Sequence, residues 1–571
     1  MKILIYREKI GIPDFPESFS GFAFDNHQIE LITISDFDKK ETIDLELSKL
    51  VRKGREENPD ILVIPVFLGS PLSYYGVRLA MHWRVDESAD NLNKIPIILL
   101  GDEDEASFYR HCGYSSFLKT PQVYYTQFNE YNLKELIESG SIKHSDFDIN
   151  ATLGHYNVKP PASYKSYHSV TNEWCILRWA DALKIEDEKI SSIRNTIGTS
   201  LYYKLLRFKY PISNIDDVKQ KALHNKGKIM LIDDEIEKGW KSIFSRICHN
   251  QEFIPIGDNF KGMETPEEIV KYTMEKVKNE FPDVVILDLR LSDNDFSDNL
   301  SPTDLTGYKI LEKIKEFNKG IQVIVISATS KIWNLLELQK IGADGFIMKE
   351  SPDLSIDSLF TKNALENIYT KSDFLLSYSF LKEFYYEYSL IKEELLPRKS
   401  FNHHNPLPKE FVDEVLKWVE LSILNICNNK NEISLTTSFL LFFSVIENIS
   451  NRIIDIDNPI SVNNSNNFYF EFRVSNQKLR FFYEETRGSG VFKKSQRKSE
   501  FPRNIQWGQK IFNTFDFISE YNIDEVEISK LIEIRNIIIH TNTTTGKGIK
   551  VTENDLKTLF NYIIKGLKKI V

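Results

Sequence analysis

Three carboxylates in this chain follow two short apolar runs and could together hold a divalent cation. Asp233 and Asp234 follow the run 228–232, and Asp288 ends the run 284–287 about 55 residues later. A buried strand that ends in a carboxylate delivers it to the carboxyl edge of a parallel sheet, where open α/β folds bind their ligands. Carboxylate oxygens that converge there are the ligands that Mg²⁺ prefers. The spacing therefore predicts a Mg²⁺ site at one sheet edge.

Two further polar side chains follow strands of the same expected sheet. Ser327 follows the apolar run 323–326, and Lys349 follows the run 345–348. An ammonium group beside Mg²⁺ would neutralise the oxygens of a phosphoryl group during its transfer. A hydroxyl would give the phosphorylated state a contact that the free state lacks, and so could bias a two-state loop. This set predicts phosphoryl transfer onto an aspartate.

The segment 226–354 resembles the receiver domain of two-component response regulators, because four separate strand ends carry the expected residue types. The resemblance implies a flavodoxin-like, doubly wound α/β fold. It also implies that Asp288 accepts a phosphoryl group from a histidine kinase or a phosphotransfer protein. The alternative is an ordinary doubly wound domain whose loops happen to begin with acidic residues.

The resemblance also assigns roles to the residues around Asp288. It implies Mg²⁺ bound by Asp233, Asp234, Asp288 and the backbone carbonyl of Arg290, phosphoryl oxygens bound by Lys349 and Ser327, and a switch aromatic residue at Phe346. The chain departs from the family in one place, since the polar segment 292–304 separates Asp288 from the turn glycine Gly307. This insertion could select the phosphodonor or shield the aspartyl phosphate, or it could be a solvated loop without a role.

The composition indicates several packed domains inside a cell. A chain of 571 residues should hold about three or four domains. Its net charge of −10 argues against a protein built wholly around nucleic acid. The four cysteines lie in no CxxC pattern, which suggests reduced thiols in a cytoplasm. The most apolar stretch, 439–446, is too short to span a bilayer, so no membrane partner is expected.

Residues 1–125 repeat the receiver pattern without its chemistry, which suggests a degenerate pseudo-receiver. The run 2–6 parallels 228–232, the run 59–65 parallels 282–288, and 113–119 parallels 342–349. Pro65 then stands at the phosphoacceptor position, Tyr6 and Arg7 replace the acidic pair, and Lys119 survives. The domain could serve docking or dimerisation, or it could be a generic α/β domain with shared topology.

Helical periodicity fills the remaining parts of the chain. We expect a helical linker over 150–225, a helical connector over 355–400 and an all-α domain over 401–571. The fold class is therefore multidomain, with two α/β domains, an all-α linker and a C-terminal helical domain.

The C-terminal segment 401–571 carries a short motif near its end. Arg535, Asn536 and His540 lie in an apolar helical pattern and resemble the Arg-x4-His motif of HEPN domains, which are all-helical modules of many prokaryotic toxins and defence ribonucleases. Glu447, in an earlier apolar helix, also fits that family. The resemblance implies metal-independent RNA cleavage in a cleft shared by two protomers, with His540 as general acid or base and Arg535 stabilising the phosphorane.

Local charge supports RNA binding only weakly. Residues 401–571 hold 22 Lys plus Arg against 20 Asp plus Glu. Six basic residues cluster in one loop, namely Arg487, Lys493, Lys494, Arg497, Lys498 and Arg503. The loop could track a phosphate backbone, but a solvated basic loop is at least as common.

Two hypotheses of different classes follow for this cytoplasmic chain. In the first, phosphorylation of Asp288 controls a HEPN-like ribonuclease, in stress or phage defence, through pairing of a homodimer. In the second, the chain is a non-enzymatic phosphorelay, phosphate sink or scaffold whose C-terminal domain only dimerises or binds a partner. A DNA-binding regulator is not expected, because the sequence shows no helix-turn-helix and no basic recognition helix.

Overall fold

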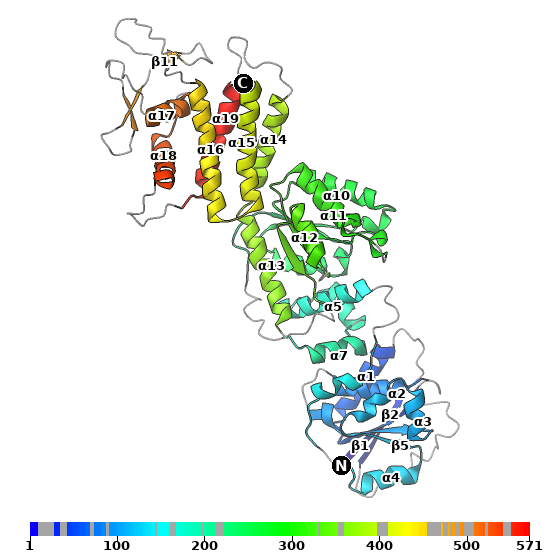
Figure 1. The fold of residues 1–571 in the computed structure, drawn as a ribbon. Helices are drawn as coiled ribbons and strands as arrows, with labels where there is room; N and C mark the ends of the chain where they lie inside the picture. The colour runs from blue at the N-terminus through cyan, green and yellow to red at the C-terminus, as the bar shows by residue number, and fades with distance from the viewer. Residues whose placement is uncertain are drawn as a thin grey trace, which may run out of the picture.

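The structure is a computed structural model of the chain, and the account below covers the residues that it describes. These are 1–8, 28–34, 43–68, 73–86, 91–142, 145–159, 167–196, 198–212, 221–297, 300–328, 332–351, 359–396, 409–453, 470–471, 478–479, 482–485, 492–495, 507–519, 523–540 and 550–570. Figure 1 shows two sheet domains, one near the N-terminus and one in the middle of the chain, and a helical bundle that holds the C-terminus.

Two five-stranded parallel sheets share one topology. Their strand orders are β2-β1-β3-β4-β5 and β7-β6-β8-β9-β10, so the second strand of each copy lies at one edge and the first strand lies next to it. Every strand pair in both sheets is parallel. The predicted pair of flavodoxin-like α/β domains, accompanied by all-α segments, is confirmed.

The first sheet domain alternates strands and helices. Its elements are β1 (Lys2–Glu8), β2 (Gln28–Ile34), α1 (Ile43–Glu56), β3 (Ile61–Pro65), α2 (Tyr75–Arg84), β4 (Ile97–Gly101), α3 (Glu105–His111), β5 (Val123–Gln127) and α4 (Glu130–Glu138), with short 3-10 helices at η3 (Asn91–Lys94), η4 (Ser115–Lys119) and η5 (Asn150–His155). Three helices follow it, α5 (Tyr167–Leu183), α6 (Glu188–Thr196) and α7 (Leu201–Lys209).

The second sheet domain has the same alternation and ends in a long helix. Its elements are β6 (Lys228–Ile232), α9 (Trp240–Ile247), β7 (Glu252–Ile256), α10 (Pro266–Glu280), β8 (Val284–Asp288), α11 (Thr306–Phe317), β9 (Gln322–Ser327), α12 (Ile332–Lys340), β10 (Gly345–Met348) and α13 (Phe360–Leu376), with 3-10 helices η6 (Ile236–Lys238), η7 (Phe260–Gly262), η8 (Asp293–Phe296) and η9 (Pro302–Asp304).

The strands of the second sheet are apolar on both faces because helices cover both. Along β6, Ile229 and Leu231 pack with α9 and α13, whereas Met230 and Ile232 pack with α10 and α11. Strands buried on both faces read as continuous apolar runs, and this is why the runs in the sequence located them. The polar residue after each run falls at the carboxyl edge of the sheet.

The helices between the two sheet domains divide between them. Helix α5 packs on the α9–α13 face of the second domain, where Trp179 meets Trp240 edge to face with ring centroids 5.4 Å apart. Helix α7 instead joins the core of the first domain through Leu201. The Leu201 backbone N–H also donates to Asp44 of α1 at 2.9 Å. The segment expected as a linker is therefore packed against both neighbours.

The segment 355–400, expected as a connector, also contributes to two cores. Helix α13 buries Leu365 and Ile368 under the second sheet. Helix α14 (Phe380–Leu395) begins four residues after α13 ends and belongs to the C-terminal bundle, where Phe384 stacks on Phe560 at 4.2 Å.

The bundle meets the second domain at the amino-terminal ends of the strands. Asp344, just before β10, pairs with Lys315 of α11 at 2.7 Å and with Lys430 of the bundle at 2.5 Å. Asn318 donates to the Lys382 carbonyl at 2.8 Å. The bundle therefore sits at the sheet edge opposite to the predicted phosphoacceptor.

The bundle is built from α14, α15 (Lys409–Asn428), α16 (Glu432–Ile453), α17 (Trp507–Ile518), α18 (Glu525–His540) and α19 (Glu553–Ile570), with four short strands, β11 (Phe470–Glu471), β12 (Lys478–Leu479), β13 (Phe482–Glu485) and β14 (Phe492–Ser495). By length and composition, the window Glu432–Asn451 of α16 could cross a membrane, but half of it is buried inside the protein. Phe439, Phe442 and Ile446 of this window lie in the bundle core. A core helix of a soluble protein has the same composition.

The two sheet domains correspond residue by residue through their backbone hydrogen bonds. Asp60 N–H donates to the Lys2 carbonyl at 2.8 Å, as Asp283 N–H does to Lys228 at 2.9 Å. This register makes Pro65 the counterpart of Asp288, as predicted from the sequence. It also places Arg7 and Glu8, rather than Tyr6 and Arg7, opposite Asp233 and Asp234, since Tyr6 aligns with Ile232.

The prediction that Lys119 is the counterpart of Lys349 is wrong. Residues 115–119 form the 3-10 helix η4, and the fifth strand begins four residues later at Val123. The Phe128 N–H donates to the Gly101 carbonyl at 2.8 Å, as the Lys349 N–H does to the Ser327 carbonyl at 2.9 Å. Phe128 therefore occupies the lysine position. The segment 113–119 contains a glycine, an aromatic residue and a lysine in the same order as 342–349, but its residues 115–119 form a 3-10 helix and not a strand.

One glycine is kept in both copies because backbone fills the space beside it. Gly76 donates to the Val66 carbonyl at 3.1 Å and Gly307 donates to the Leu289 carbonyl at 3.0 Å. A Cβ at Gly76 would lie 1.7 Å from the backbone carbonyl oxygen of Pro65, and a Cβ at Gly307 would lie 2.3 Å from the backbone carbonyl oxygen of Asp288. The turn after the third strand therefore requires glycine with or without an aspartate before it.

We expect Gly76→Ala to destabilise the first domain by about 1–3 kcal/mol, because the added methyl group meets a backbone carbonyl that cannot rotate away. Gly113→Ala is the matched control, since a Cβ there would meet no atom within 4 Å. Calorimetric unfolding of the full chain measures both. Equal transition temperatures for the two variants would contradict the steric account.

Candidate functional site

A buried lysine bridges two aspartates at the carboxyl edge of the second sheet. The Lys349 Nζ lies 2.9 Å from Asp288 Oδ2 and 3.1 Å from Asp233 Oδ2. Lys349 is fully buried, and Asp233 and Asp288 are each only 1% exposed. Residues at the carboxyl ends of β6, β8 and β10 therefore meet at one point, as the sequence predicted. The bridge leaves the carboxylates with one more negative charge than the lysine balances.

Asp288 is oriented by a second donor. Its Oδ1 accepts a hydrogen bond from the Leu289 backbone N–H at 2.8 Å, while its Oδ2 faces Lys349. The carboxylate is thus fixed from both sides, which holds it in one orientation for reaction.

The third carboxylate completes a set that suits a hard divalent cation. Asp233, Asp234 and Asp288 each offer an oxygen, and these oxygens lie within 4.8 Å of one another. Asp234 Oδ1 is buried, and no hydrogen-bond partner for it exists among the described residues. A buried oxygen without a donor is costly unless a ligand satisfies it. The residues present therefore fit Mg²⁺, which takes oxygen ligands and often keeps several waters.

The protonation equilibria of the cluster reflect burial and mutual repulsion. Burial raises the pKa of Asp233 to about 6, an effect that Lys349 opposes and Asp288 reinforces. Burial and the carboxylates of Asp233 and Asp288 raise the pKa of Asp234 to about 9. Burial alone would lower the pKa of Lys349, but the two carboxylates outweigh it and the pKa is raised. Lys349 therefore stays protonated, but its single positive charge does not balance all of the carboxylates.

The other predicted residues of this site lie nearby in varied environments. Ser327 is the last residue of β9 and is half-buried. Phe346 in β10 packs partly into the core that faces α10 and α11. Arg290 is exposed, with its guanidinium 5.6 Å from the ring centroid of Phe296. The proposed roles of Ser327, Phe346 and the Arg290 carbonyl stay predictions.

Three residues beside the cluster were missed by the sequence reasoning. The Trp240 ring lies under Lys349, with 4.9 Å between Nζ and the ring centroid. The Glu235 N–H donates to Asp233 Oδ1 at 2.8 Å. Glu350, directly after Lys349, is fully buried. The adjacency of Glu235 and Glu350 to site residues was a signal, but only the fold shows that both are turned inward.

The insertion after Asp288 is folded around a buried carboxylate. Asp295 is 2% exposed and accepts from the N–H groups of Leu291, Ser292 and Thr306, and from the Thr306 hydroxyl, at 2.8–3.1 Å. Thr306 is the first residue of α11. In the described part of the insertion, this aspartate therefore ties the loop to the helix that follows. Whether the insertion selects a phosphodonor stays a prediction.

The corresponding edge of the first sheet carries different chemistry. Arg7, Pro65, Gly101 and Phe128 stand where the second domain has Asp233, Asp288, Ser327 and Lys349. A Cβ at Gly101 would lie 2.0 Å from the Tyr125 hydroxyl, so a serine there would displace that ring. At these four described positions, the edge has neither the aspartates nor the lysine nor the hydroxyl of the second site.

The C-terminal residues predicted to cleave RNA are only partly brought together. Arg535 on α18 pairs with Glu447 of α16 at 2.8 Å, and its guanidinium lies 4.3 Å from the Trp507 ring centroid. Arg535 Nη1 also donates to Asn536 Oδ1 at 3.3 Å. His540 ends the helix and is exposed, and among the described residues no hydrogen bond joins it to Arg535. The side chains of the six-residue basic loop lie outside the described residues.

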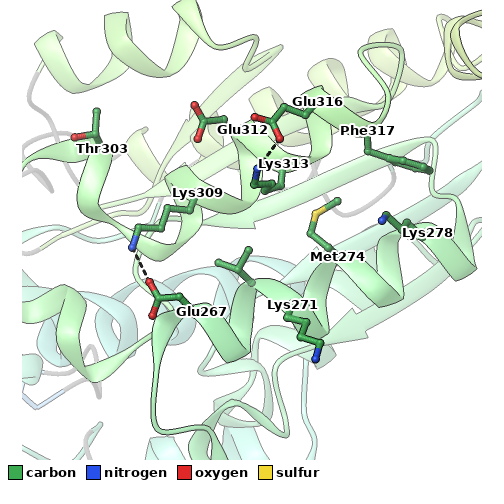
Figure 2. Close-up of a pocket in the computed structure, with 11 residues that line it drawn as sticks. Glu267, Lys271, Met274, Lys278, Thr303, Lys309, Glu312, Lys313, Glu316 and Phe317 are labelled. Atoms are coloured by element: carbon green, nitrogen blue, oxygen red, sulfur yellow. Dashed lines mark hydrogen bonds and ion pairs between the residues drawn. The ribbon is translucent and has the colours of Figure 1, made fainter. Parts of the chain in front are cut away.

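A groove elsewhere on the second domain is separate from this chemistry. Figure 2 shows it between α10 and α11, with Val270, Met274 and Phe317 among its lining side chains. Its volume is about 820 Å³. The ion pairs Lys309–Glu267 and Lys313–Glu316 lie along it, and none of the acidic-cluster residues line it.

Comparison with protein families identifies both sheet domains. Residues 20–126 match the inactive receiver domain, and residues 264–359 match the response regulator receiver domain. The chain therefore holds two receiver-type domains of the kind found in two-component response regulators, and the first is of the inactive type. Among curated proteins, none matches the chain.

Solved structures give distant likenesses. The receiver domain of NtrX from Brucella abortus is 22% identical and covers 24% of this chain and 98% of its own, with a TM-score of 0.16. A longer NtrX structure is 22% identical, and the match covers 26% of this chain, with a TM-score of 0.17. This chain spans only 28% of the length of that structure. A LuxR-family response regulator from Aurantimonas sp. SI85-9A1 is 17% identical and covers 25% of this chain and 86% of its own, with a TM-score of 0.17.

We expect Asp234→Asn to stabilise the metal-free protein at pH 8. Folding raises the pKa of Asp234 from near 4 to about 9, so this residue destabilises the folded protein increasingly as the pH rises from about 4 to about 9. The neutral amide removes this effect, so the free energy of unfolding should rise by at most about 5 kcal/mol, because about four pKa units of about 1.4 kcal/mol each separate the unfolded value from pH 8. The same variant should lose the stabilisation that added Mg²⁺ gives. Thermal unfolding at pH 5 and pH 8, with and without Mg²⁺, measures both effects.

Asp293→Asn is the control, because Asp293 is exposed in the loop after β8 and lies outside the cluster. It should respond to Mg²⁺ as the parent protein does. An unchanged Mg²⁺ response in Asp234→Asn would remove Asp234 from the metal site.

Proposed function

We propose that the chain is a response regulator whose Asp288 accepts a phosphoryl group from a histidine kinase or phosphotransfer protein. The observation that carries this proposal is the Lys349 bridge, with Nζ at 2.9 Å from Asp288 and 3.1 Å from Asp233 beside a third carboxylate. Three carboxyl groups and a lysine gathered in one largely buried pocket are costly to maintain, and phosphoryl transfer is a reaction that uses all of them.

The transfer step follows from the geometry of Asp288. A carboxylate oxygen of Asp288 attacks the phosphorus of a phosphohistidine, the phosphorus–nitrogen bond breaks, and the imidazole leaves with the electron pair. Lys349 moves its hydrogen bond toward a phosphoryl oxygen and so compensates the charge that develops in the transition state. Mg²⁺, held by Asp233, Asp234, Asp288 and the Arg290 carbonyl, would supply further charge compensation. The Ser327 hydroxyl would bond the product and Phe346 would respond to it.

The C-terminal domain is proposed as a HEPN-like RNA-cleaving effector. The observation that supports this proposal is the ion pair between Arg535 of α18 and Glu447 of α16, which lies over Trp507 and brings the two helices of the motif into contact. His540 is exposed at the end of α18 and could act as general acid or base on a bound RNA. Phosphorylation would then control protomer pairing in a homodimer, in stress or phage defence.

The second candidate is a non-enzymatic phosphorelay, phosphate sink or scaffold. The observation that favours it is the Glu447–Arg535 pair itself, because an arginine neutralised by a carboxylate is less available to stabilise a phosphorane. In this reading the bundle only dimerises or binds a partner. In both readings the protein is cytoplasmic.

We expect Asp288→Asn to abolish phosphoryl incorporation from acetyl phosphate with Mg²⁺, since the amide is no nucleophile. Lys349→Ala should lower the rate by about 10²-fold or more, because a preorganised charge in a buried site is lost. Phosphate-affinity gels and intact mass report the incorporation. Asp293→Asn should behave as the parent protein, and a phosphorylated Asp288→Asn protein would place the acceptor elsewhere.

We expect His540→Ala to reduce RNA cleavage by about 10²-fold or more if the bundle is an effector enzyme, because general acid–base catalysis contributes that much. Cleavage of a labelled single-stranded RNA is followed with and without beryllium fluoride, which mimics the phosphoryl group. His249→Ala is the control, since His249 is exposed in the second domain. Absence of cleavage in the parent protein in either state would favour the relay, sink or scaffold.

A further inference from the structure

Helix α5 precedes the second receiver domain in the chain and yet forms bonds to two turns of its phosphoacceptor site. Its apolar face, which includes Ile176 and Trp179, packs against α9 and α13 of that domain. Two polar residues of the same helix, Asn172 and Arg178, reach past this apolar contact. Asn172 is fully buried and Arg178 is 1% exposed.

Asn172 is bonded to the turn that holds the acidic pair. Its Nδ2 donates to Glu235 Oε2, and Lys238 pairs with the other oxygen of the same carboxylate. The Glu235 backbone N–H in turn donates to Asp233 Oδ1 at 2.8 Å. A single residue therefore separates Asn172 from a carboxylate of the acidic cluster.

Arg178 is bonded to the turn that holds the site lysine. Its Nε donates to Glu350 Oε1 at 3.0 Å, and the Thr361 hydroxyl donates to Glu350 Oε2 at 2.6 Å. The Glu350 N–H donates to Cys175 Sγ, again on α5, at 3.3 Å. Since Glu350 directly follows Lys349, its backbone position sets where the Lys349 side chain begins.

The two attachments make α5 a rigid spacer between the site's two turns. Asn172 and Arg178 are six positions apart on the helix, which is about 9 Å along the axis. A buried ion pair such as Arg178–Glu350 is weak evidence for stability, because desolvation offsets the attraction between the charges. Its cost is understandable if it fixes the geometry of a reaction that is sensitive to displacements of about 1 Å.

We propose that Asn172 and Arg178 are positioning residues for phosphoryl transfer at Asp288. Asn172 acts through Glu235 on the carboxylates that would bind Mg²⁺, and Arg178 acts through Glu350 on Lys349. The inference rests on the proposed phosphoacceptor role of Asp288 and adds to it a helix that the receiver domain itself does not contain.

The same helix links the site to the inactive receiver domain. Trp174 of α5 stacks on Tyr203 of α7 with ring centroids 6.0 Å apart. Helix α7 is anchored in the first domain through Leu201 and Asp44. Helix α5 therefore contacts elements of both receiver-type domains.

The experiment measures the initial rate of phosphorylation of the full-length protein by acetyl phosphate across a range of Mg²⁺ concentrations. Asn172→Ala should raise the half-saturating Mg²⁺ concentration several-fold, because the metal-binding turn loses its support. Arg178→Gln should lower the limiting rate by roughly tenfold with little change in the Mg²⁺ response. Arg178→Lys should recover part of that rate, since it keeps the charge opposite Glu350.

Asp181→Asn is the matched control on the same helix. Asp181 pairs with Arg194 at 2.7 Å and with Arg207 at 3.2 Å, and neither partner belongs to the site. This variant should keep both kinetic parameters of the parent protein. If Arg178→Gln does not fold, Glu350→Gln removes the same ion pair from the other side and should show the same loss of rate.

The outcomes separate this inference from the function on which it rests. A parent protein that takes no phosphoryl group refutes the phosphoacceptor function and the inference together. A parent protein that is phosphorylated, with folded Asn172→Ala and Arg178→Gln variants that match it in both parameters, refutes the inference alone. Equal losses in Asp181→Asn would also refute it, because they would reflect general damage to α5.

Discussion

The contact on which the second domain depends is the one between the Lys349 ammonium and the carboxylates of Asp233 and Asp288. Without that cation, the buried carboxylates of Asp233 and Asp288 and the partly buried carboxylate of Asp234 would face one another. With it, the repulsion is reduced but not removed, and the raised pKa values of Asp233 and Asp234 record what remains. When all four groups are ionised, three carboxylates and one lysine leave the pocket short of positive charge, which favours a divalent cation.

The two receiver-type domains show which parts of the fold depend on that chemistry. The described residues of the first domain include no counterpart of the lysine bridge, and the domain still keeps the strand order, the Asp60–Lys2 backbone hydrogen bond and the glycine after the third strand. Apolar strands and close backbone turns are therefore sufficient for the architecture. The aspartates and the lysine of the second domain add cost rather than stability, so their presence is best explained by a reaction.

Much of the second domain could be predicted from sequence because its strands are buried on both faces and end in polar residues. Asp233, Asp288 and Lys349 were placed at one edge by that pattern alone. The first domain was harder, since Lys119 has a strand-like context and only the Phe128–Gly101 hydrogen bond shows that the fifth strand lies further on. Asn172 and Arg178 could not be found at all, because their partners lie 63 and 172 residues away and no local pattern encodes such contacts. In the bundle, the Glu447–Arg535 pairing agrees with the motif, whereas the chemistry of His540 is still a prediction.

The position of Asp344 determines which end of the second sheet stays open to other molecules. Its pairs with Lys315 and Lys430 fasten the bundle to the amino-terminal ends of the strands, while the acidic cluster opens at their carboxyl ends. Helix α13, 17 residues and about 25 Å long, runs between the two. If Asp288 is the phosphoacceptor, as proposed, its phosphodonor would approach the end of the sheet that lies away from the described helices of the bundle. A phosphodonor and a ligand of the bundle would then need no common space, so both could be engaged on one chain at the same moment.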